Sequence, residues 1–153
     1  MLNPIEHYES KLAFETDSWD LKVSLESGEN VVLVDARSAA AFQREHIPGA
    51  INIPHASISA EATNHLDNGA LIVTYCDGIG CNASTKAALR MAKLGFRVKE
   101  LIGGLDWWKR DGHKTESASG PRHGRPGTPL PRTPSALGTR TSGDREKIPP
   151  STC

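Results

Sequence analysis

Two cysteines stand close together where an apolar stretch runs into a glycine-rich loop. The stretch LIVTYCDGIGCNASTKAAL, residues 71–89, is rich in β-branched residues up to Cys76 and then carries two glycines and Cys81 before a helix-like segment. Backbone N–H groups of such a loop, together with those of a first helical turn, can cradle an anion. These surroundings favour the thiolate, the nucleophilic form of cysteine. The pattern therefore predicts a reactive Cys76, with a small buried residue that merely finishes a strand as the ordinary alternative.

Short apolar runs alternate with polar or helix-like stretches along residues 1–116. Four runs are typical of β-strands, at residues 31–36, 50–54, 71–76 and 98–103. Near-continuous apolar strands separated by helices indicate an α/β fold whose parallel sheet is covered on both faces. Ligands of such sheets bind at the carboxyl ends of the strands, where Cys76 stands. Ahead of the first strand we expect two helices, one starting near Pro4 and one ending at Gly28.

Composition bounds the class of protein. A chain of 153 residues predicts one domain, and its 18 basic and 18 acidic residues give no indication of a nucleic-acid or membrane partner. No segment has the apolar length of a signal peptide or a membrane span. Three cysteines, an odd number, indicate thiols in a reducing compartment rather than a disulfide framework. We therefore expect a cytoplasmic location. The spacing of the Cys and His residues indicates no metal site.

The C-terminal segment differs from the rest. Residues 117–153 hold seven of the ten prolines, no aromatic residue, and six basic against two acidic residues. This composition buries too little apolar surface to offset the entropy of ordering, so we expect a disordered Pro/Gly/Arg-rich tail. The expected organisation is an N-terminal helical extension over residues 1–19, a domain over residues 20–116 and the tail over 117–153.

Three stretches together resemble the rhodanese-like (sulfurtransferase) domain family, single-domain type. VLVDARSAAAFQREHIPGAINIP is similar to the family's first signature, YCDGIGCN places Cys76 at the position of the catalytic cysteine, and LIGGLDWWKRDGHKTE is similar to the closing signature. Each stretch alone would be a weak indication, but their order and spacing are specific. The resemblance implies a rhodanese-like α/β fold with a central mostly parallel sheet and helices on both faces.

The resemblance also implies a reaction. The Cys76 thiolate takes a sulfane sulfur from a donor, thiosulfate or a persulfide, holds it as a persulfide, and passes it to an acceptor thiol or cyanide. No cofactor is implied, and the expected partners are a small sulfur donor or a persulfidated protein and an acceptor thiol. Asp35 and Arg37 are interpreted mainly as a supporting ion pair, and His46 as structural. The residues expected to form the active loop and to bind substrate are Asp77, Gly78, Ile79, Gly80, Cys81 and Asn82.

The loop departs from the family pattern in its charge and length. Asp77 follows the nucleophile directly, and no Arg or Lys occurs before Lys86. A carboxylate at this place repels a dianionic donor, so thiosulfate is expected to be a poorer substrate than a persulfide. The loop also looks about two residues longer than in short single-domain members, a feature of related phosphatases and arsenate reductases. Those enzymes need Cys-x5-Arg to grip an oxyanion, and here Asn82 occupies the arginine position.

Three other features have open interpretations. Cys81 could resolve an oxidised or persulfidated Cys76, act as a second sulfur relay, or play no part. Gly103 and Gly104 would allow close backbone approach beneath the loop, and Trp107 and Trp108 are expected in the core and its rim. A helical spacing of basic residues is either a solvated face or a guide for an acidic sulfur carrier. These are Lys86, Arg90, Lys93 and Arg97.

Two functions from different classes therefore remain. The first is a sulfurtransferase with Cys76 as nucleophile. The second is a weakly or non-catalytic rhodanese-like module for binding or redox sensing. Cys76, Asp35 and Arg37 favour the first, whereas Asp77 and the degenerate tail keep the second open.

Overall fold

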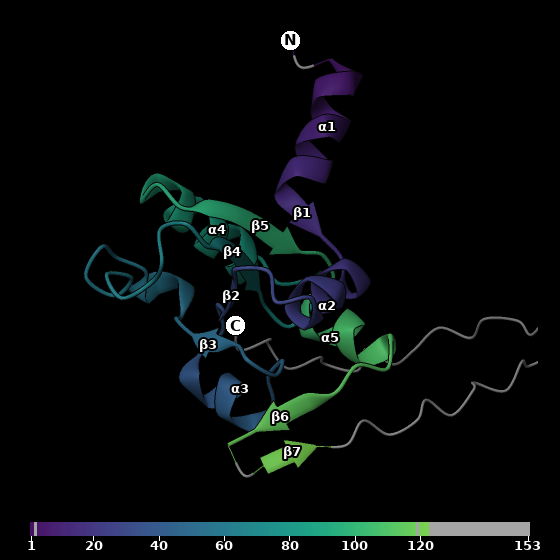
Figure 1. Cartoon of the computed structure of the whole chain (residues 1–153), viewed down its shortest axis with the longest axis vertical. Helices are drawn as coiled ribbons and strands as arrows, with labels where there is room; N and C mark the ends of the chain where they lie inside the picture. The colour runs from purple at the N-terminus through teal and green to yellow at the C-terminus, as the bar shows by residue number, and fades with distance from the viewer. Residues whose placement is uncertain (2, 119, 123–153) are drawn as a thin grey trace, which may run out of the picture.

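A parallel sheet forms the centre of the molecule. The computed structural model describes residues 1, 3–118 and 120–122. Its main sheet has five strands in the order β1-β5-β4-β2-β3, and every neighbouring pair is parallel (Figure 1). This confirms the predicted α/β fold and places β4 in the middle. The strands are β1 (Glu15–Thr16), β2 (Val31–Asp35), β3 (Ile51–Asn52), β4 (Leu71–Tyr75) and β5 (Arg97–Leu101).

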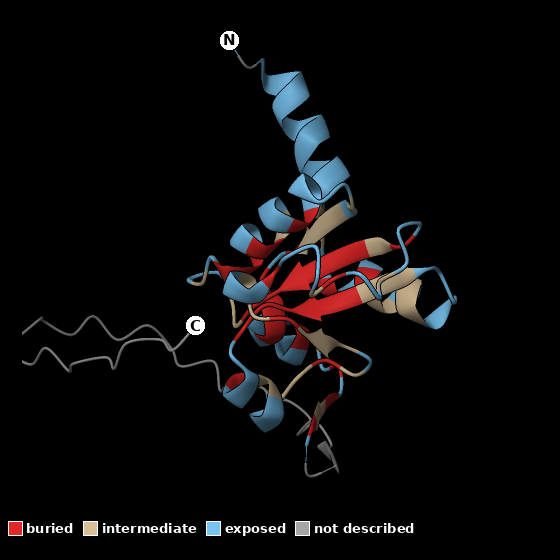
Figure 2. Cartoon of the chain, turned by 90° about the vertical axis from the view of Figure 1, so that its left-hand side faces the viewer, coloured by how far each residue is buried: buried red, intermediate tan, exposed pale blue. Residues whose placement is uncertain are grey.

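Both faces of the sheet are packed against helices, because alternate strand residues point to opposite faces. Ile72 of β4 packs with Ala87 and Met91 of the helix that follows it. Val73, on the other face, packs in a second cluster with Leu21 and Trp108. Figure 2 shows the buried strands between these layers. The helices are α1 (Pro4–Phe14), α2 (Ser18–Glu26), α3 (Ala39–Arg44), the 3₁₀ turn η1 (His55–Ser57), α4 (Ala83–Lys93) and α5 (Gly104–Arg110).

The N-terminal helix α1 projects from the molecule and is exposed along its length (Figures 1 and 2). Its start follows from the sequence: the Asn3 side chain accepts a hydrogen bond from the Glu6 N–H, and Pro4 occupies the first turn. None of its side chains is buried. Within residues 1–19, which the sequence assigned to an extension, Glu15 and Thr16 pair with β5 and α2 already begins at Ser18.

Several element boundaries differ from the sequence-based expectation. The strand expected over residues 50–54 is reduced to Ile51–Asn52, since Pro54 lacks an N–H and the chain turns into η1. Arg97 lies in β5, so only Lys86, Arg90 and Lys93 of the expected basic face belong to α4. The separation has a clear cause, because Gly95 has φ +91 just after α4 and begins the turn into β5.

A short antiparallel pair lies beyond α5. β6 (Thr115–Ser117) pairs with β7 (Gly120–Arg122), so the first residues of the segment expected to be disordered form a strand pairing. β6 is also held to the body, because the His46 N–H donates to the Glu116 carbonyl at 2.8 Å. The rest of the expected tail, residues 123–153, lies outside the described residues. Within the described part of the chain, no helix combines the length and apolar character needed to cross a membrane.

Candidate functional site

Cys76 lies at the carboxyl end of the central strand, directly after β4. Its side chain is 1 % exposed, and it forms part of the apolar cluster with Ile72 and Ala83. The loop of residues 77–82 then leads into α4, as the sequence predicted. The thiol of Cys76 is free, so Cys76 and Cys81 are not bridged. The strand end, the loop and the start of α4 therefore converge on this sulfur.

The sulfur of Cys76 faces oxygen atoms. Its Sγ lies 3.2 Å from the Cys81 carbonyl, 3.7 Å from the Gly78 carbonyl and 3.5 Å from Ser84 Oγ. Among the described residues no backbone N–H donates to the Cys76 sulfur itself. One amide of the loop is engaged in a turn, in which the Cys81 N–H donates to the Gly78 carbonyl at 3.2 Å. This arrangement suits a protonated thiol, because carbonyl oxygens accept hydrogen bonds and cannot donate them to a thiolate.

Arg37 joins three segments around the loop. Its Nε and Nη2 bind the Asp35 carboxylate at 3.0 and 2.6 Å, and Nη2 also donates to the Glu45 carbonyl at 2.6 Å. Its Nη1 donates to Asp77 Oδ1 at 2.8 Å. Asp35 and Arg37 are both buried. The expected ion pair is thus present, and it extends to Asp77, whose carboxylate is held by Arg37 at the rim of the loop.

The electrostatics of this cluster keep it in one charge state. Burial lowers the pKa of Arg37, but the hydrogen bonds and charge of Asp35, with a further hydrogen bond to Asp77, raise it above its ordinary value. Tyr75 lies beneath, with its ring centroid 5.8 Å from the Arg37 guanidinium carbon. Burial and the nearby Asp35 charge raise the pKa of Tyr75, and its hydroxyl accepts a hydrogen bond from the Ile47 N–H. Both groups therefore stay protonated and act as structural supports.

The N-terminal residues of α5 support the loop from below. The Leu105 N–H donates to the Cys76 carbonyl at 2.9 Å, and the Asp106 N–H donates to the Asp77 carbonyl at 2.8 Å. Gly104 has φ +54, and a Cβ on it would stand 2.3 Å from the Cys76 carbonyl oxygen. The close approach expected of this glycine is therefore real, and no larger residue fits there without displacing the loop.

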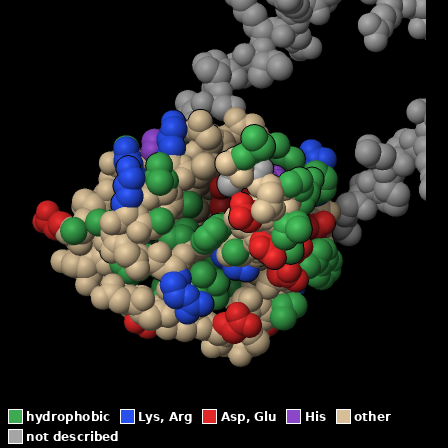
Figure 3. Space-filling model, turned by 90° about the horizontal axis from the view of Figure 1, so that it is seen from above, with side chains coloured by type: hydrophobic (Ala, Val, Ile, Leu, Met, Phe, Trp, Pro, Cys, Tyr) green, Lys and Arg blue, Asp and Glu red, His purple; other side chains and the backbone are tan. Residues whose placement is uncertain are grey.

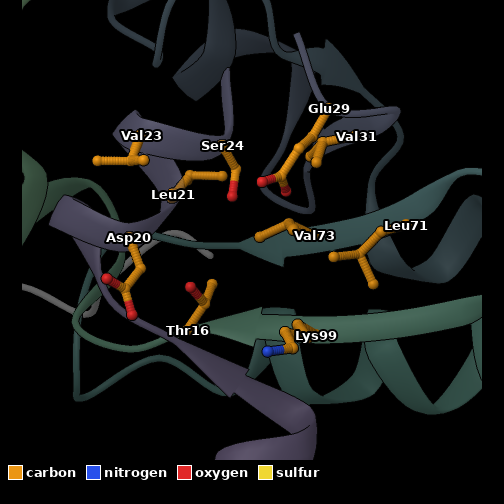
Figure 4. Close-up of a pocket in the computed structure, with 10 residues that line it drawn as sticks. All are labelled: Thr16, Asp20, Leu21, Val23, Ser24, Glu29, Val31, Leu71, Val73 and Lys99. Atoms are coloured by element: carbon orange, nitrogen blue, oxygen red, sulfur yellow. The ribbon is translucent and has the colours of Figure 1, made fainter. Parts of the chain in front are cut away.

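Two cavities flank the loop. One, of about 540 Å³, is lined by the loop residues Gly78, Ile79, Gly80, Cys81 and Asn82, together with the end of β5 and parts of α1 and α4. The other, of about 280 Å³, is lined by Arg37, Asp77 and Asp106 among others. A separate cavity of about 280 Å³ lies between α2 and the sheet (Figure 4), and none of the predicted site residues lines it. The loop cavities are therefore the relevant ones.

Some residues at the site were not anticipated from the sequence. Ser84, in the first turn of α4, lies within 3.5 Å of the Cys76 sulfur and donates to Glu100 Oε1 at 2.7 Å. Thr85 donates to the same Glu100 oxygen, also at 2.7 Å. Glu100 and Ser84 are 16 positions apart, and only the passage from α4 into β5 brings them together. In the sequence, the one sign of this contact was a charged residue, Glu100, within the segment that forms β5.

The remaining predicted residues have structural surroundings. His46 Nδ1 lies 2.8 Å from the Phe42 carbonyl, and its ring stacks on Phe42 at a centroid distance of 3.9 Å. Trp108 is buried, with its Nε1–H donating to the Lys114 carbonyl, whereas Trp107 is partly exposed. These positions agree with the interpretation of His46 as structural and of the two tryptophans as core and rim.

Known proteins are similar to this chain in sequence and fold. The model of the family described as Rhodanese-like domain matches residues 20–111. A crystal structure of the BH2092 protein from Bacillus halodurans is 45 % identical, covers 77 % of this chain and 89 % of its own, and superimposes with a TM-score of 0.72. A thiosulfate sulfurtransferase, GlpE, from Coxiella burnetii is 30 % identical over 92 residues, 59 % of this chain and 81 % of that protein.

A third relative is a longer protein that is named as a transcriptional regulator. The HTH-type transcriptional regulator Rv0324 from Mycobacterium tuberculosis is 38 % identical over 102 residues, 65 % of this chain. The chain spans 43 % of that regulator's length. The family model, the parallel sheet and the position of Cys76 after β4 agree with one another. The chain belongs to the rhodanese-like domain family.

Proposed function

We propose that the protein is a sulfurtransferase that carries a sulfane sulfur on Cys76. The observation that carries the proposal is the place of this thiol: it directly follows the central strand, at the start of a loop whose backbone is held by α5. Relatives named thiosulfate sulfurtransferase and tRNA sulfurtransferase support the reaction class. A reducing compartment such as the cytoplasm suits this chemistry, because Cys76 must remain a thiol between turnovers.

The reaction has two displacement steps. In the first, the Cys76 thiolate attacks the outer sulfur of a persulfide or of thiosulfate, a Cys76–sulfur bond forms, and the donor's sulfur–sulfur bond breaks to release a thiolate or sulfite. In the second, an acceptor thiolate or cyanide attacks the outer sulfur of the Cys76 persulfide. The acceptor then carries the sulfur, and the Cys76 thiolate is regenerated. No net oxidation is needed, because each step exchanges one sulfur bond for another.

Persulfides are the proposed donors, with thiosulfate a weaker one. The cavity beside the loop contains the carboxylates of Glu100 and Glu15, and Lys11 is its only basic residue among those described. Lys11 already pairs with Glu15 at 2.9 Å. A dianion therefore meets a negative environment there. The acceptor is proposed to be a thiol for the same reason.

Mass spectrometry of the intact protein tests the proposal. After incubation with thiosulfate or a small persulfide, the protein should gain the mass of one sulfur atom, and cyanide should remove it. Cys76→Ser should abolish the gain, and Cys81→Ser should retain it. If Cys81 resolves the persulfide, the adduct should also last longer in Cys81→Ser.

The alternative function is a rhodanese-like module with little turnover. Its specific support is the buried Cys76 sulfur that faces carbonyl oxygens. The relative that is a transcriptional regulator shows that the domain also occurs in a protein named for another role. Absence of a sulfur adduct with every donor would favour this module, and an adduct on Cys81 instead would overturn the assignment of Cys76.

A further inference from the structure

A chain of hydrogen bonds connects the Cys76 sulfur to a carboxylate. Cys76 Sγ lies 3.5 Å from Ser84 Oγ, and Ser84 Oγ donates to Glu100 Oε1 at 2.7 Å. Since the Ser84 proton is directed to the carboxylate, its oxygen presents a lone pair to the sulfur. The Cys81 carbonyl, 3.2 Å from the same sulfur, is an acceptor as well. All of these contacts favour S–H over S⁻.

Glu100 differs from the other carboxylates around the site. Asp35 and Asp77 bind Arg37, Asp106 binds Arg110 at 3.1 Å, and Glu15 binds Lys11. In the described part of the chain Glu100 takes part in no ion pair, and its oxygen is satisfied by the hydroxyls of Ser84 and Thr85. Among the described carboxylates around the site, Glu100 is therefore the one that contacts no cation, whereas Asp35 and Asp77 share the single charge of Arg37. The charged groups that share a cavity with Glu100 are Lys11 and Glu15. The cavity on the other side of the loop is lined by Arg37, Arg44, Glu45, Asp77, Asp106 and Lys109, and Asp35 lies behind Arg37.

We propose that Glu100, acting through Ser84, is a positioning residue that holds Cys76 as a hydrogen-bonded thiol and disfavours negative charge at its sulfur. Two consequences follow. Removing the Glu100 charge should let Cys76 react as its thiolate at lower pH. An anionic reagent is also disfavoured relative to a neutral one of the same shape. The proposal rests on Cys76 being the reactive thiol of the proposed function, but it needs no sulfur donor to be tested.

Alkylation of the full-length protein tests both consequences. Rates of modification of the Cys76 peptide by neutral iodoacetamide and by anionic iodoacetate are measured by mass spectrometry as a function of pH. In Glu100→Gln, the amide oxygen still accepts from Ser84 and Thr85, but the charge is gone. The iodoacetamide profile should move to lower pH by about one unit, as expected for removing a charge at this distance. The iodoacetate to iodoacetamide rate ratio should rise about threefold or more.

Two further variants distinguish the proposed role of Glu100 from a general loosening of the loop. Ser84→Ala removes the acceptor for the S–H and should also move the profile to lower pH, by less. Thr85→Val is the matched control, because it removes the same kind of hydrogen bond from the same Glu100 oxygen without touching Cys76. Its profile and rate ratio should stay close to those of the wild type.

Defined outcomes overturn the proposal. One is a Glu100→Gln profile that is unchanged or shifted to higher pH; another is a Thr85→Val shift as large as that of Glu100→Gln. An equal rise in both alkylation rates, with no change in their ratio, would show that the loop had only opened. A sulfur adduct on Cys76 in the mass experiment together with an unchanged Glu100→Gln profile would reject the role of Glu100 and leave the proposed function intact.

Discussion

Arg37 is the residue on which the geometry of the loop depends most. It is the counter-charge of Asp35, which is fully buried, and it also reaches Asp77 and the Glu45 carbonyl. Removing one partner of a buried pair leaves the other charge without compensation, which costs far more than the pair itself contributes.

Arg37→Met should therefore lower the free energy of unfolding by about 3–5 kcal/mol. Lys109→Met is the control: Lys109 pairs with Glu45 at 2.8 Å on the surface, and its loss should cost less than about 1 kcal/mol. Urea denaturation of both variants measures the difference. Similar losses in the two proteins would contradict the assigned role of Arg37.

Asp77 affects which sulfur donors the protein accepts. The sequence suggested that its carboxylate repels dianionic donors, whereas the structure shows it bound to Arg37. Asp77→Asn should release Arg37 Nη1 toward the adjoining cavity, where it can attract an anion. We expect kcat/KM for thiosulfate to rise about tenfold, equivalent to about 1.4 kcal/mol.

Asp106→Asn provides the comparison for that change. Asp106 lines the same cavity but pairs with Arg110 instead of Arg37. Its substitution should leave thiosulfate kcat/KM near the wild-type value. A larger effect from Asp106→Asn than from Asp77→Asn would show that Arg37 is not the group that is released.

At the scale of elements, the contact between α5 and the loop is the critical one. Gly104→Ala would place a methyl group against the Cys76 carbonyl at a positive φ. Gly112, with φ +84, has no atom near its would-be Cβ, so Gly112→Ala carries the backbone strain alone, about 1–2 kcal/mol. Gly104→Ala should lower the midpoint of thermal unfolding more than Gly112→Ala and should slow formation of the Cys76 adduct. Equal midpoints for Gly104→Ala and Gly112→Ala would mean that the loop accommodates the added methyl group with no further loss of stability.

The elements also show what a sequence can predict. The runs at residues 31–36 and 71–76 match β2 and β4 to within one residue, because buried parallel strands are continuous apolar runs. β1 has only Glu15 and Thr16 and no apolar pattern, so its strand character comes from its pairing with β5. Cys76, Asp35 and Arg37 could be placed from motifs. Ser84 and Glu100 could not, since their contact exists only after α4 folds back on the sheet.

At the scale of the whole molecule, two histidines make stability depend on pH. Burial, with the nearby Lys22, lowers the pKa of His113, which packs against Trp19 and Trp108 at centroid distances of 4.6 Å. Burial and the charges of Lys86 and Arg90 lower the pKa of His55. The folded state thus prefers the neutral rings. The stability they contribute is fully present above the unfolded pKa of about 6.5 and is lost as pH falls below it.

His113→Phe should reduce the loss of stability at low pH. Urea denaturation at pH 7.5 and at about pH 5 should show a smaller decline in the free energy of unfolding for His113→Phe than for the wild type. His7→Gln, on the exposed helix α1, should decline as the wild type does. If His113→Phe and the wild type decline in parallel, His113 does not contribute to the acid sensitivity.

The strand order also determines when the site can form during synthesis. β4 lies between β2 and β5, and the Cys76 carbonyl is held by the Leu105 N–H. A growing chain that has reached residue 90 has made the cysteine but neither β5 nor α5. Since domains fold largely as units and parallel strands pair across long separations, the thiol stays open to oxidants until β5 and α5 have left the ribosome. The sulfur is therefore more open to oxidation in the newly made chain than in the folded domain, where it is buried.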